Sequence, residues 1–388
     1  MTMRDKTAIA GIGTSEFGRF LPDSPMGLAA KAFKAALADS GLTRDDVDGL
    51  SINIGWPLGV DYDRFAEIMG LKTRYVSQMW THGRFVTSAL QHAAMAVATG
   101  MADCVACICG IGFTRLREVL GGHGDFEGTR EEGGGHGENP VYGITAPAAG
   151  AALSMRRYME RYGVTTAQLA AVPVAIRKHA NLNPQAIVKE PLTVEGHQAA
   201  RMIVDPLRLF DCALTSDGAA CVLVVSAQRA KDLAKLPVYL SGLQGMRSGR
   251  EEFIFAAPGL GINQQSPAKI PLDADLESYR MAGVTHKDID GLYTYDAFSP
   301  LPLFVLERFG FCGEGEAAAW VQGGRIELGG QLPINTSGGL LSEAHVSGWN
   351  SIVEIVRQLR GECGPRQIKD AEILQWATVW GDSIIFRR

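Results

Sequence analysis

The side chains of this 388-residue sequence that are most able to attack a substrate directly are its seven cysteines. Their number is odd, and no second cysteine pair or histidine set completes a zinc site. Cys104 and Cys107 have the C-x-x-C spacing of redox motifs, but they lie in an apolar run ending at Cys109, which favours a buried strand. The seven positions are Cys104, Cys107, Cys109, Cys212, Cys221, Cys312 and Cys363.

A glycine-dense polar stretch, residues 111–140, holds two histidines that are candidates for metal binding, His123 and His136. Neither has a cysteine or carboxylate at a spacing that would complete a metal site, so we interpret both as solvated loop residues and expect no metal. A loop of this length is typical of a lid or a flexible excursion.

Composition limits the class of protein. With 46% hydrophobic residues and 46 glycines, the chain predicts a globular, layered α/β enzyme. The net charge of −5 and the absence of a Lys/Arg-rich block exclude a nucleic-acid footprint. No apolar stretch approaches the ~20 residues of a membrane span. The charged N-terminus lacks a secretory apolar region, so the expected location is the cytoplasm.

Hydrophobic periodicity predicts alternating strands and helices around these side chains. A helix over residues 25–40 should end at Gly41, and Thr43 is placed to cap the turn that follows. The strands are expected at residues 7–13, 102–110 and 222–225, and further helices at 86–100, 146–163 and 165–181.

One ten-residue segment recurs within the chain. Residues 41–50 read GLTRDDVDGL, and residues 283–292, which lie 242 positions later, read GVTHKDIDGL with six identities. Each copy follows a helical pattern and leads into a strand, which favours a duplicated half over a chance match. We therefore predict an N-terminal half over residues 1–240, with an insertion at about 111–205, and a C-terminal half over 241–388.

Four sets of segments resemble the sterol-carrier-protein-type thiolases, also called nonspecific lipid-transfer-protein thiolases. They are IAGIGTSEFG at residues 9–18, LFDCALTSDGAA at 209–220, DAF at 296–298 with GFCGEG at 310–315, and NTSGGLLSEAHVSG at 335–348. The resemblance covers nearly the whole chain, in the family's order. It implies the thiolase fold, an α/β architecture in which duplicated βαβαβαββ halves form a five-layer αβαβα sandwich, and it implies a homodimer.

Thiolases of this type use a cysteine at a helix N-terminus to take the acyl group and a second cysteine near the C-terminus to move the α-proton. Both are missing here: residues 81–88 and 377–382 contain no cysteine. Ser88 is a weak replacement for the nucleophile, and its alternative role is the N-cap of the helix. In the same stretch Gly83 is a candidate for contact with the substrate oxyanion, and Arg84 either binds a coenzyme A phosphate or lies on the surface.

The family's two histidine positions correspond here to Tyr295 and His345. A phenol is a hydrogen-bond donor and an imidazole exchanges protons near neutral pH, so together they suit proton transfer at a β-oxygen. Asp296 would orient a neighbour or cap a loop. The substrate and oxyanion candidates Ser337, Gly338 and Gly339 would shape the turn before a helix bearing His345, with backbone N–H groups toward the thioester oxygen.

The pattern resembles the cysteine-free aldolases of steroid side-chain degradation, which cleave a β-hydroxyacyl-CoA by a retro-aldol reaction. These carry tyrosines at both positions, whereas this chain has one tyrosine and one histidine. The resemblance also implies a small OB-fold/zinc-ribbon partner protein, with coenzyme A present only as part of the substrate and no other cofactor. Two alternatives stay open: an acyltransferase with another nucleophile, and a non-catalytic acyl-CoA or lipid carrier.

The acyl group itself is not indicated by the sequence. Several large side chains are candidates for lining a wide apolar pocket, although core packing is the more common role of such residues. They are Met26, Trp56, Trp80, Phe85, Trp320 and Trp349.

Overall fold

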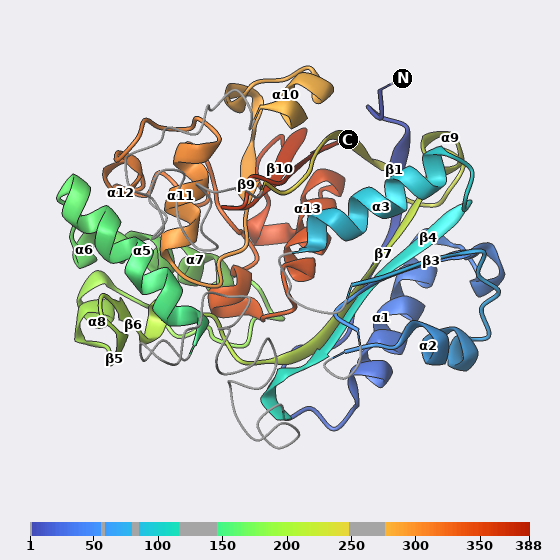
Figure 1. Ribbon diagram of the computed structural model, residues 1–388, viewed down its shortest axis with the longest axis horizontal. Helices are drawn as coiled ribbons and strands as arrows, with labels where there is room; N and C mark the ends of the chain where they lie inside the picture. Colours follow the sequence, from blue (N-terminus) through green and yellow to red (C-terminus); the bar gives the residue numbers. More distant parts are fainter. Residues whose placement is uncertain (1, 56–58, 80–84, 116–145, 248–275) are drawn as a thin grey trace.

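The computed structural model describes residues 2–55, 59–79, 85–115, 146–247 and 276–388. Nine of the described strands form one sheet in the order β3-β2-β4-β7-β1-β8-β11-β10-β9 (Figure 1). Their bounds are β1 Thr7–Thr14, β2 Gly49–Asn53, β3 Tyr75–Met79, β4 Cys104–Gly112, β7 Asp217–Ser226, β8 Val238–Gln244, β9 Gly291–Tyr293, β10 Ile373–Ala377 and β11 Ser383–Arg387.

The sheet consists of two halves with the same pairing pattern. In the first half, β2 and β4 are parallel, and β7 and β1 then follow as antiparallel neighbours. In the second half, β9 and β10 are parallel, and β11 and β8 follow as antiparallel neighbours. The halves meet where β1 pairs antiparallel with β8, with Ala8 opposite Tyr239. The duplication predicted from the sequence is therefore confirmed in the topology.

The recurring ten-residue segment folds in the same way in both halves. Its first residue, Gly41 or Gly283, ends a helix in the left-handed region with φ of 75° or 69°. A capping box then follows, in which Asp46 accepts from the Thr43 backbone N–H at 2.8 Å and Asp288 accepts from the Thr285 N–H at the same distance. Each copy leads into a strand of the large sheet, β2 or β9.

The helices lie in layers against this sheet. One apolar core joins α1 to one face of the first half, and a second core joins the opposite face to α3 and α13. In the second half α10 packs on β8 and β11, in the place that α1 takes in the first half. The layers therefore follow one another as α1, the first half of the sheet, α3 with α13, the second half of the sheet, and α10. This is the five-layer arrangement of the thiolase fold.

The main helices are α1 Pro25–Ser40, α2 Tyr62–Met69, α3 Val86–Ala98, α10 Glu277–Ala282, α11 Pro300–Arg308 and α13 Trp349–Arg360, with single turns α9 Ala227–Ala230 and α12 Ala317–Trp320.

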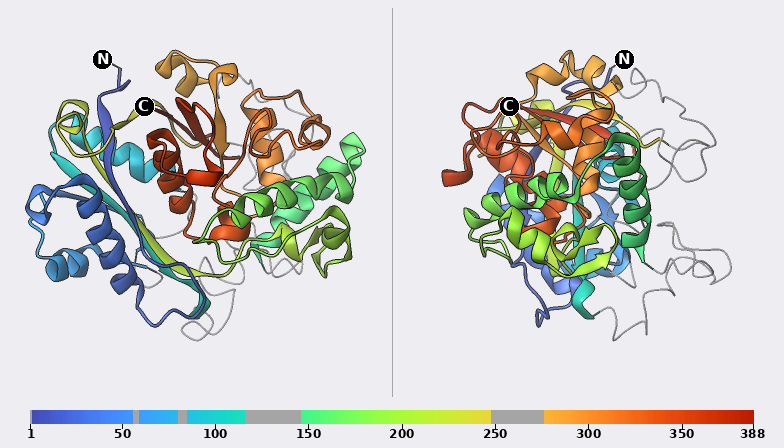
Figure 2. Two further views of the ribbon diagram at one scale, coloured as in Figure 1. Left: turned by 180° about the vertical axis from the view of Figure 1, so that it is seen from behind. Right: turned by 90° about the vertical axis from the view of Figure 1, so that its left-hand side faces the viewer.

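The chain between β4 and β7 builds a separate helical excursion. Figures 1 and 2 show it beside the second half of the sheet, on the far side from α1 and α2. Its described elements are α5 Pro147–Tyr162, α6 Thr166–Leu169, α7 Ala171–Asn181, α8 Val194–Ala199 and the two-stranded sheet β5 Met202–Val204 with β6 Leu207–Arg208. Among the described residues, no helix combines the length and apolarity needed to cross a bilayer.

Candidate active site

The structure brings Tyr295 and His345 together although they are 50 residues apart. Tyr295 follows β9, and His345 lies between the turn Gly339–Glu343 and α13. The Tyr295 hydroxyl oxygen is 3.1 Å from His345 Nε2, which is hydrogen-bonding distance. Tyr295 is 9% exposed and His345 is half-buried, so the pair lies at the edge of the core.

Hydrogen bonds hold the backbone of the residue before Tyr295 and the backbone of His345 in place. The preceding residue, Thr294, donates its N–H to Asn335 Oδ1 at 2.9 Å, and Asn335 Nδ2 donates back to the Thr294 carbonyl at 3.0 Å. The His345 N–H in turn donates to Ser216 Oγ at 2.8 Å. Both functional side chains therefore start from backbone whose position is set by hydrogen bonds from distant parts of the chain.

Asp296 is fully buried and caps the turn before His345. Its carboxylate accepts from the Leu340 N–H at 2.8 Å and from the Leu341 N–H at 3.4 Å. Burial raises the pKa of Asp296 to about 7, against the lowering effect of these backbone N–H groups. Of the two roles considered for Asp296, the structure shows the cap.

The turn containing Ser337, Gly338 and Gly339 differs from the expectation in one respect. It forms a single π-helical turn, Gly339–Glu343, and His345 follows it on an extended segment, so the predicted His345 helix was wrong. Gly338 and Gly339 have φ of 106° and 53°, values that favour glycine. The Gly338 N–H donates to the Asn335 carbonyl at 3.0 Å, so it is engaged within the protein.

Glu343, which the sequence reasoning did not single out, anchors the end of this turn. Its carboxylate accepts from Ser337 Oγ at 2.6 Å and from the side-chain amides of Asn183 and Asn350, both at 2.8 Å. Burial raises the pKa of Glu343. The sequence signal for Glu343 was its place inside the thiolase-like segment 335–348. Its partners could not be read from that segment alone, because Asn183 follows α7 and Asn350 lies on α13.

The N-terminus of α3, where thiolases place the acylated cysteine, holds a buried polar network instead. The Thr87 hydroxyl donates to Asp382 and accepts from Trp376 Nε1 at 2.9 Å. Burial raises the pKa of Asp382 to about 6. The helix begins at Val86 with Phe85 at the N-cap, so the predicted N-cap role of Ser88 was wrong: Ser88 is the third helical residue.

Aromatic rings flank the Tyr295–His345 pair. Trp380 lies in the turn between β10 and β11, where thiolases place the second cysteine, and its ring centroid is 5.5 Å from that of Tyr295. Phe113, at the end of β4, lies 5.4 Å from the His345 ring. Neither aromatic residue had been selected from the sequence, because only the folded chain brings their segments together.

All seven cysteines are described, and burial raises the pKa of every one of their thiols. The pKa values of Cys104 and Cys212 rise to about 12. The three cysteines of β4 are fully buried, as expected for a buried strand. A thiol acts as a nucleophile only as its thiolate, so none of these cysteines is placed to take over covalent catalysis.

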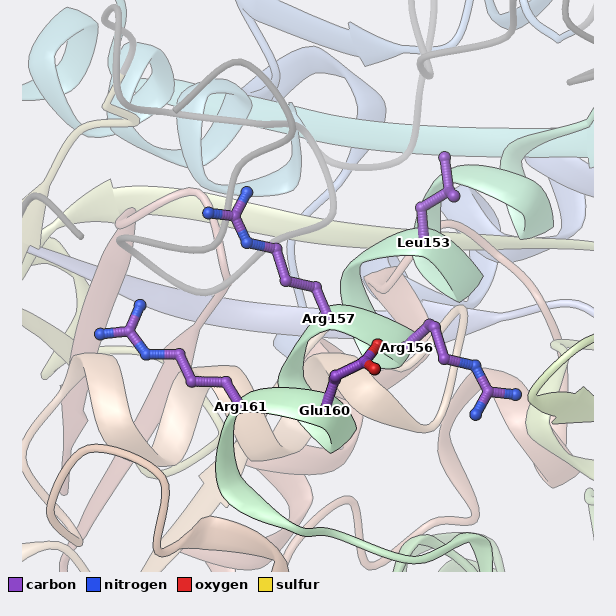
Figure 3. Close-up of a pocket in the computed structure, with 5 residues that line it drawn as sticks. All are labelled: Leu153, Arg156, Arg157, Glu160 and Arg161. Atoms are coloured by element: carbon purple, nitrogen blue, oxygen red, sulfur yellow. The ribbon is translucent and has the colours of Figure 1, made fainter. Parts of the chain in front are cut away.

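A hollow of about 390 Å³ lies on the surface of α5, and its lining residues are separate from the Tyr295–His345 pair (Figure 3). Carboxylates bind its arginines: Arg156 pairs with Asp205, and Arg161 pairs with Glu314 at 3.2 Å. The hollow is lined by Leu153, Arg156, Arg157, Glu160 and Arg161.

Several sequence candidates are not part of the pair's surroundings. Trp349 is fully buried and donates through Nε1 to Asn53 Oδ1 at 2.8 Å, so it belongs to the core. In the described ranges, no group of three His, Cys, Asp or Glu side chains could hold a metal ion. Predictions that lie outside the described residues concern Trp56, Trp80, Gly83, Arg84, His123 and His136.

Comparison with known proteins places this geometry in context. A family model described as "Thiolase C-terminal domain-like" matches residues 272–381. The chain is 38% identical over 367 residues to a 17-hydroxy-3-oxo-4-pregnene-20-carboxyl-CoA lyase of Mycobacterium tuberculosis, covering 92% of each chain. It is also 38% identical over 367 residues to a steroid side-chain-cleaving aldolase of Thermomonospora curvata, covering 91% of this chain and 90% of the relative.

Solved structures agree with these relatives. An Ltp2-ChsH2(DUF35) aldolase structure superposes with a TM-score of 0.87 at 34% identity, covering 99% of this chain and 98% of that one. Human mitochondrial 3-ketoacyl-CoA thiolase in complex with CoA superposes with a TM-score of 0.70 at 14% identity, over 100% of this chain and 99% of that one, which shows the shared fold.

Proposed function

We propose, from the premise that this chain belongs to the thiolase superfamily, that it cleaves a carbon–carbon bond of a β-hydroxyacyl-CoA by a retro-aldol reaction. The observation that carries the proposal is the hydrogen-bonded pair of Tyr295 and His345 at a site without a reactive thiol. Retro-aldol cleavage requires a base for the β-hydroxyl proton and stabilisation of an enolate, but no covalent acyl acceptor.

In the proposed reaction the pair acts as a proton relay. With His345 neutral and unprotonated at Nε2, the Tyr295 O–H donates to it across the 3.1 Å contact. The phenolic oxygen takes the β-hydroxyl proton as its own proton passes to His345. The O–H electron pair forms the β-carbonyl, the Cα–Cβ bond breaks, and its electrons form the thioester enolate. The enolate carbon then recovers one proton, which leaves a ketone or aldehyde and a shorter acyl-CoA.

A bulky apolar acyl group is the proposed substrate class. Two of the similar proteins are named for steroid side-chain cleavage or for a pregnene carboxyl-CoA substrate. In this chain Phe113 and Trp380 place aromatic rings on either side of the pair, at 5.4 Å from His345 and 5.5 Å from Tyr295. Such rings favour a flat apolar ligand over a short polar one.

The test is intact-protein mass spectrometry combined with chromatography of products from a panel of β-hydroxyacyl-CoA thioesters, short-chain to polycyclic. We expect an unmodified protein mass, a carbonyl product and a shorter acyl-CoA in equal amounts. A stable acyl adduct would instead indicate transfer through Ser88 or a cysteine. Tight binding of the thioester without turnover, with the partner protein present, would indicate a carrier.

The proposed assembly contains a second copy of this chain and a small OB-fold/zinc-ribbon partner in the cytoplasm. The similar Ltp2-ChsH2(DUF35) aldolase is named for two components. Strand β3 is one of the two edge strands of the nine-stranded sheet and exposes Val76, which offers a pairing edge to a second copy. All seven cysteines are free, as is usual in a reducing compartment.

Light scattering of the chain alone should give a mass of twice the 41.6 kDa chain mass, and addition of the partner protein should raise the measured mass. A monomeric mass would contradict the dimer.

A further inference from the structure

We infer that Asp296 is a positioning residue, which keeps Tyr295 in contact with His345 by binding the turn that precedes the histidine. The inference rests on the proposed function, because it assigns the pair as the proton relay. Asp296 is fully buried and directly follows Tyr295, so it acts through its neighbours and not by touching substrate. Its two carboxylate oxygens are each within hydrogen-bonding distance of a different backbone N–H, those of Leu340 and Leu341.

The two strands of backbone that carry the pair are tied at two points, one on each side of Tyr295. On the N-terminal side, Thr294 and Asn335 exchange two hydrogen bonds of 2.9 and 3.0 Å. On the C-terminal side, the Asp296 carboxylate accepts from the N–H groups of Leu340 and Leu341. Loss of the second tie would remove the hydrogen bonds that hold the residue after Tyr295 against the turn before His345.

Gly339 shows how closely the carboxylate fits the turn. A Cβ atom on Gly339 would lie 2.2 Å from Asp296 Oδ2, closer than any real contact. Gly339 also has φ of 53°, in the left-handed region that favours glycine. Glycine at this position therefore leaves room for the carboxylate. Because the two are in such close contact, we expect a change of the Asp296 side chain to alter the conformation of the turn.

The charge of Asp296 supports the same role. Burial raises its pKa to about 7, against the lowering effect of its hydrogen bonds to the Leu340 N–H and the Asn335 side chain. Titratable or charged side chains on the segments packed around it include Tyr295, His345, the buried Glu343 and Arg177 of α7, which donates to Ser342 in the same turn. A carboxylate accepts two N–H bonds more strongly than a neutral carboxyl, so protonation of Asp296 weakens the tie to Leu340 and Leu341.

The test compares Asp296→Asn with Asp290→Asn, a matched control. Asp290 also accepts two backbone N–H bonds, from Glu372 at 2.8 Å and Ile373 at 2.9 Å, but it lies before β9 at the far end from the pair. We expect D296N to lower kcat by about 10- to 100-fold with little change in KM, because a misplacement of about 1 Å costs that much. D290N should leave kcat unchanged.

Two further readouts separate positioning from general destabilisation. In the wild type, activity should fall as the pH drops through about 7, partly because Asp296 takes up a proton. D296N cannot take up this proton, so the acid limb of its pH–activity profile should lack that ionisation. Crystal structures of both proteins should show the separation of the Tyr295 hydroxyl and His345 Nε2 longer than 3.1 Å only in D296N.

An unchanged kcat, pH profile and Tyr295–His345 separation in D296N would overturn the inference. If wild-type protein cleaves no thioester but D296N still separates the pair in the crystal, the proposed function fails and the positioning role stands. Should D296N not fold, Asn335→Ala removes the two hydrogen bonds to Thr294 on the other side of Tyr295. We expect the same longer distance between the Tyr295 hydroxyl and His345 Nε2 in that variant.

Discussion

Tyr295→Phe is expected to lower kcat for carbon–carbon cleavage by about 10²- to 10⁴-fold, the usual contribution of a positioned acid–base group. The substitution removes only the hydroxyl that lies 3.1 Å from His345 Nε2, and it leaves the ring against Trp380. KM should change little, because ring packing with the substrate is retained. Steady-state kinetics on a cleaved thioester, with quantified carbonyl product, measure the effect.

The control for this variant is Tyr279→Phe. Tyr279, on α10, is also buried, and its hydroxyl donates to Gln375 Oε1 on β10 at 2.7 Å, not to either member of the pair. This change should leave kcat unaffected at a modest cost in stability. Equal losses in the two variants would show that the effect of Tyr295→Phe is structural.

His345→Ala should produce a loss of similar size, and the double variant should be little worse than either single one. Two groups that pass one proton act as a unit, so their contributions are not additive. Strictly additive losses would mean that Tyr295 and His345 act on separate steps, and would contradict the relay.

Glu354→Ala is expected to lower the free energy of unfolding by about 3–5 kcal/mol, the usual cost of removing one partner from a buried ion pair. Glu354, on α13, binds Arg366 through two contacts of 2.9 and 3.0 Å, and both side chains are nearly inaccessible to solvent. Its Oε1 also accepts from Thr336 Oγ1 at 3.1 Å, which links the pair to the segment that leads to His345. Without Glu354 the Arg366 charge would stay buried and uncompensated.

Equilibrium unfolding in urea measures this loss, and Glu372→Ala is the matched control. Glu372 forms an exposed ion pair with Arg388 at 3.3 Å, and such pairs contribute only about 0–1 kcal/mol. If both variants lost the same small amount, the Glu354–Arg366 pair would not be a main element of stability. If Arg366→Met combined with Glu354→Leu restored stability, the cost would be confirmed as that of an uncompensated charge.

The sequence alone determined the features that depend on neighbours a few residues apart. Helical spacing and a terminal glycine predicted α1 and its end at Gly41, and the Thr43 capping turn formed as expected in both repeats. The apolar run at Cys104 predicted the buried strand β4. These signals are readable because capping, turn formation and strand alternation act within about four residues. The thiolase-like segments added the fold and named Tyr295 and His345 as candidates.

Only the tertiary structure decided how the site is held. Ser88 satisfied the sequence preference for an N-cap, yet α3 begins at Val86, and the Thr87 hydroxyl within its first turn is bound by Asp382, which is 295 positions away. His345 lies after a π-helical turn instead of in the expected helix, and the Asp296 carboxylate binds this turn from another part of the chain. Contacts of this kind are set when distant segments pack together and their polar groups must be satisfied out of water. Local sequence preferences contain no information about such partners, so the chemistry of the site was readable from residue types while its geometry was not.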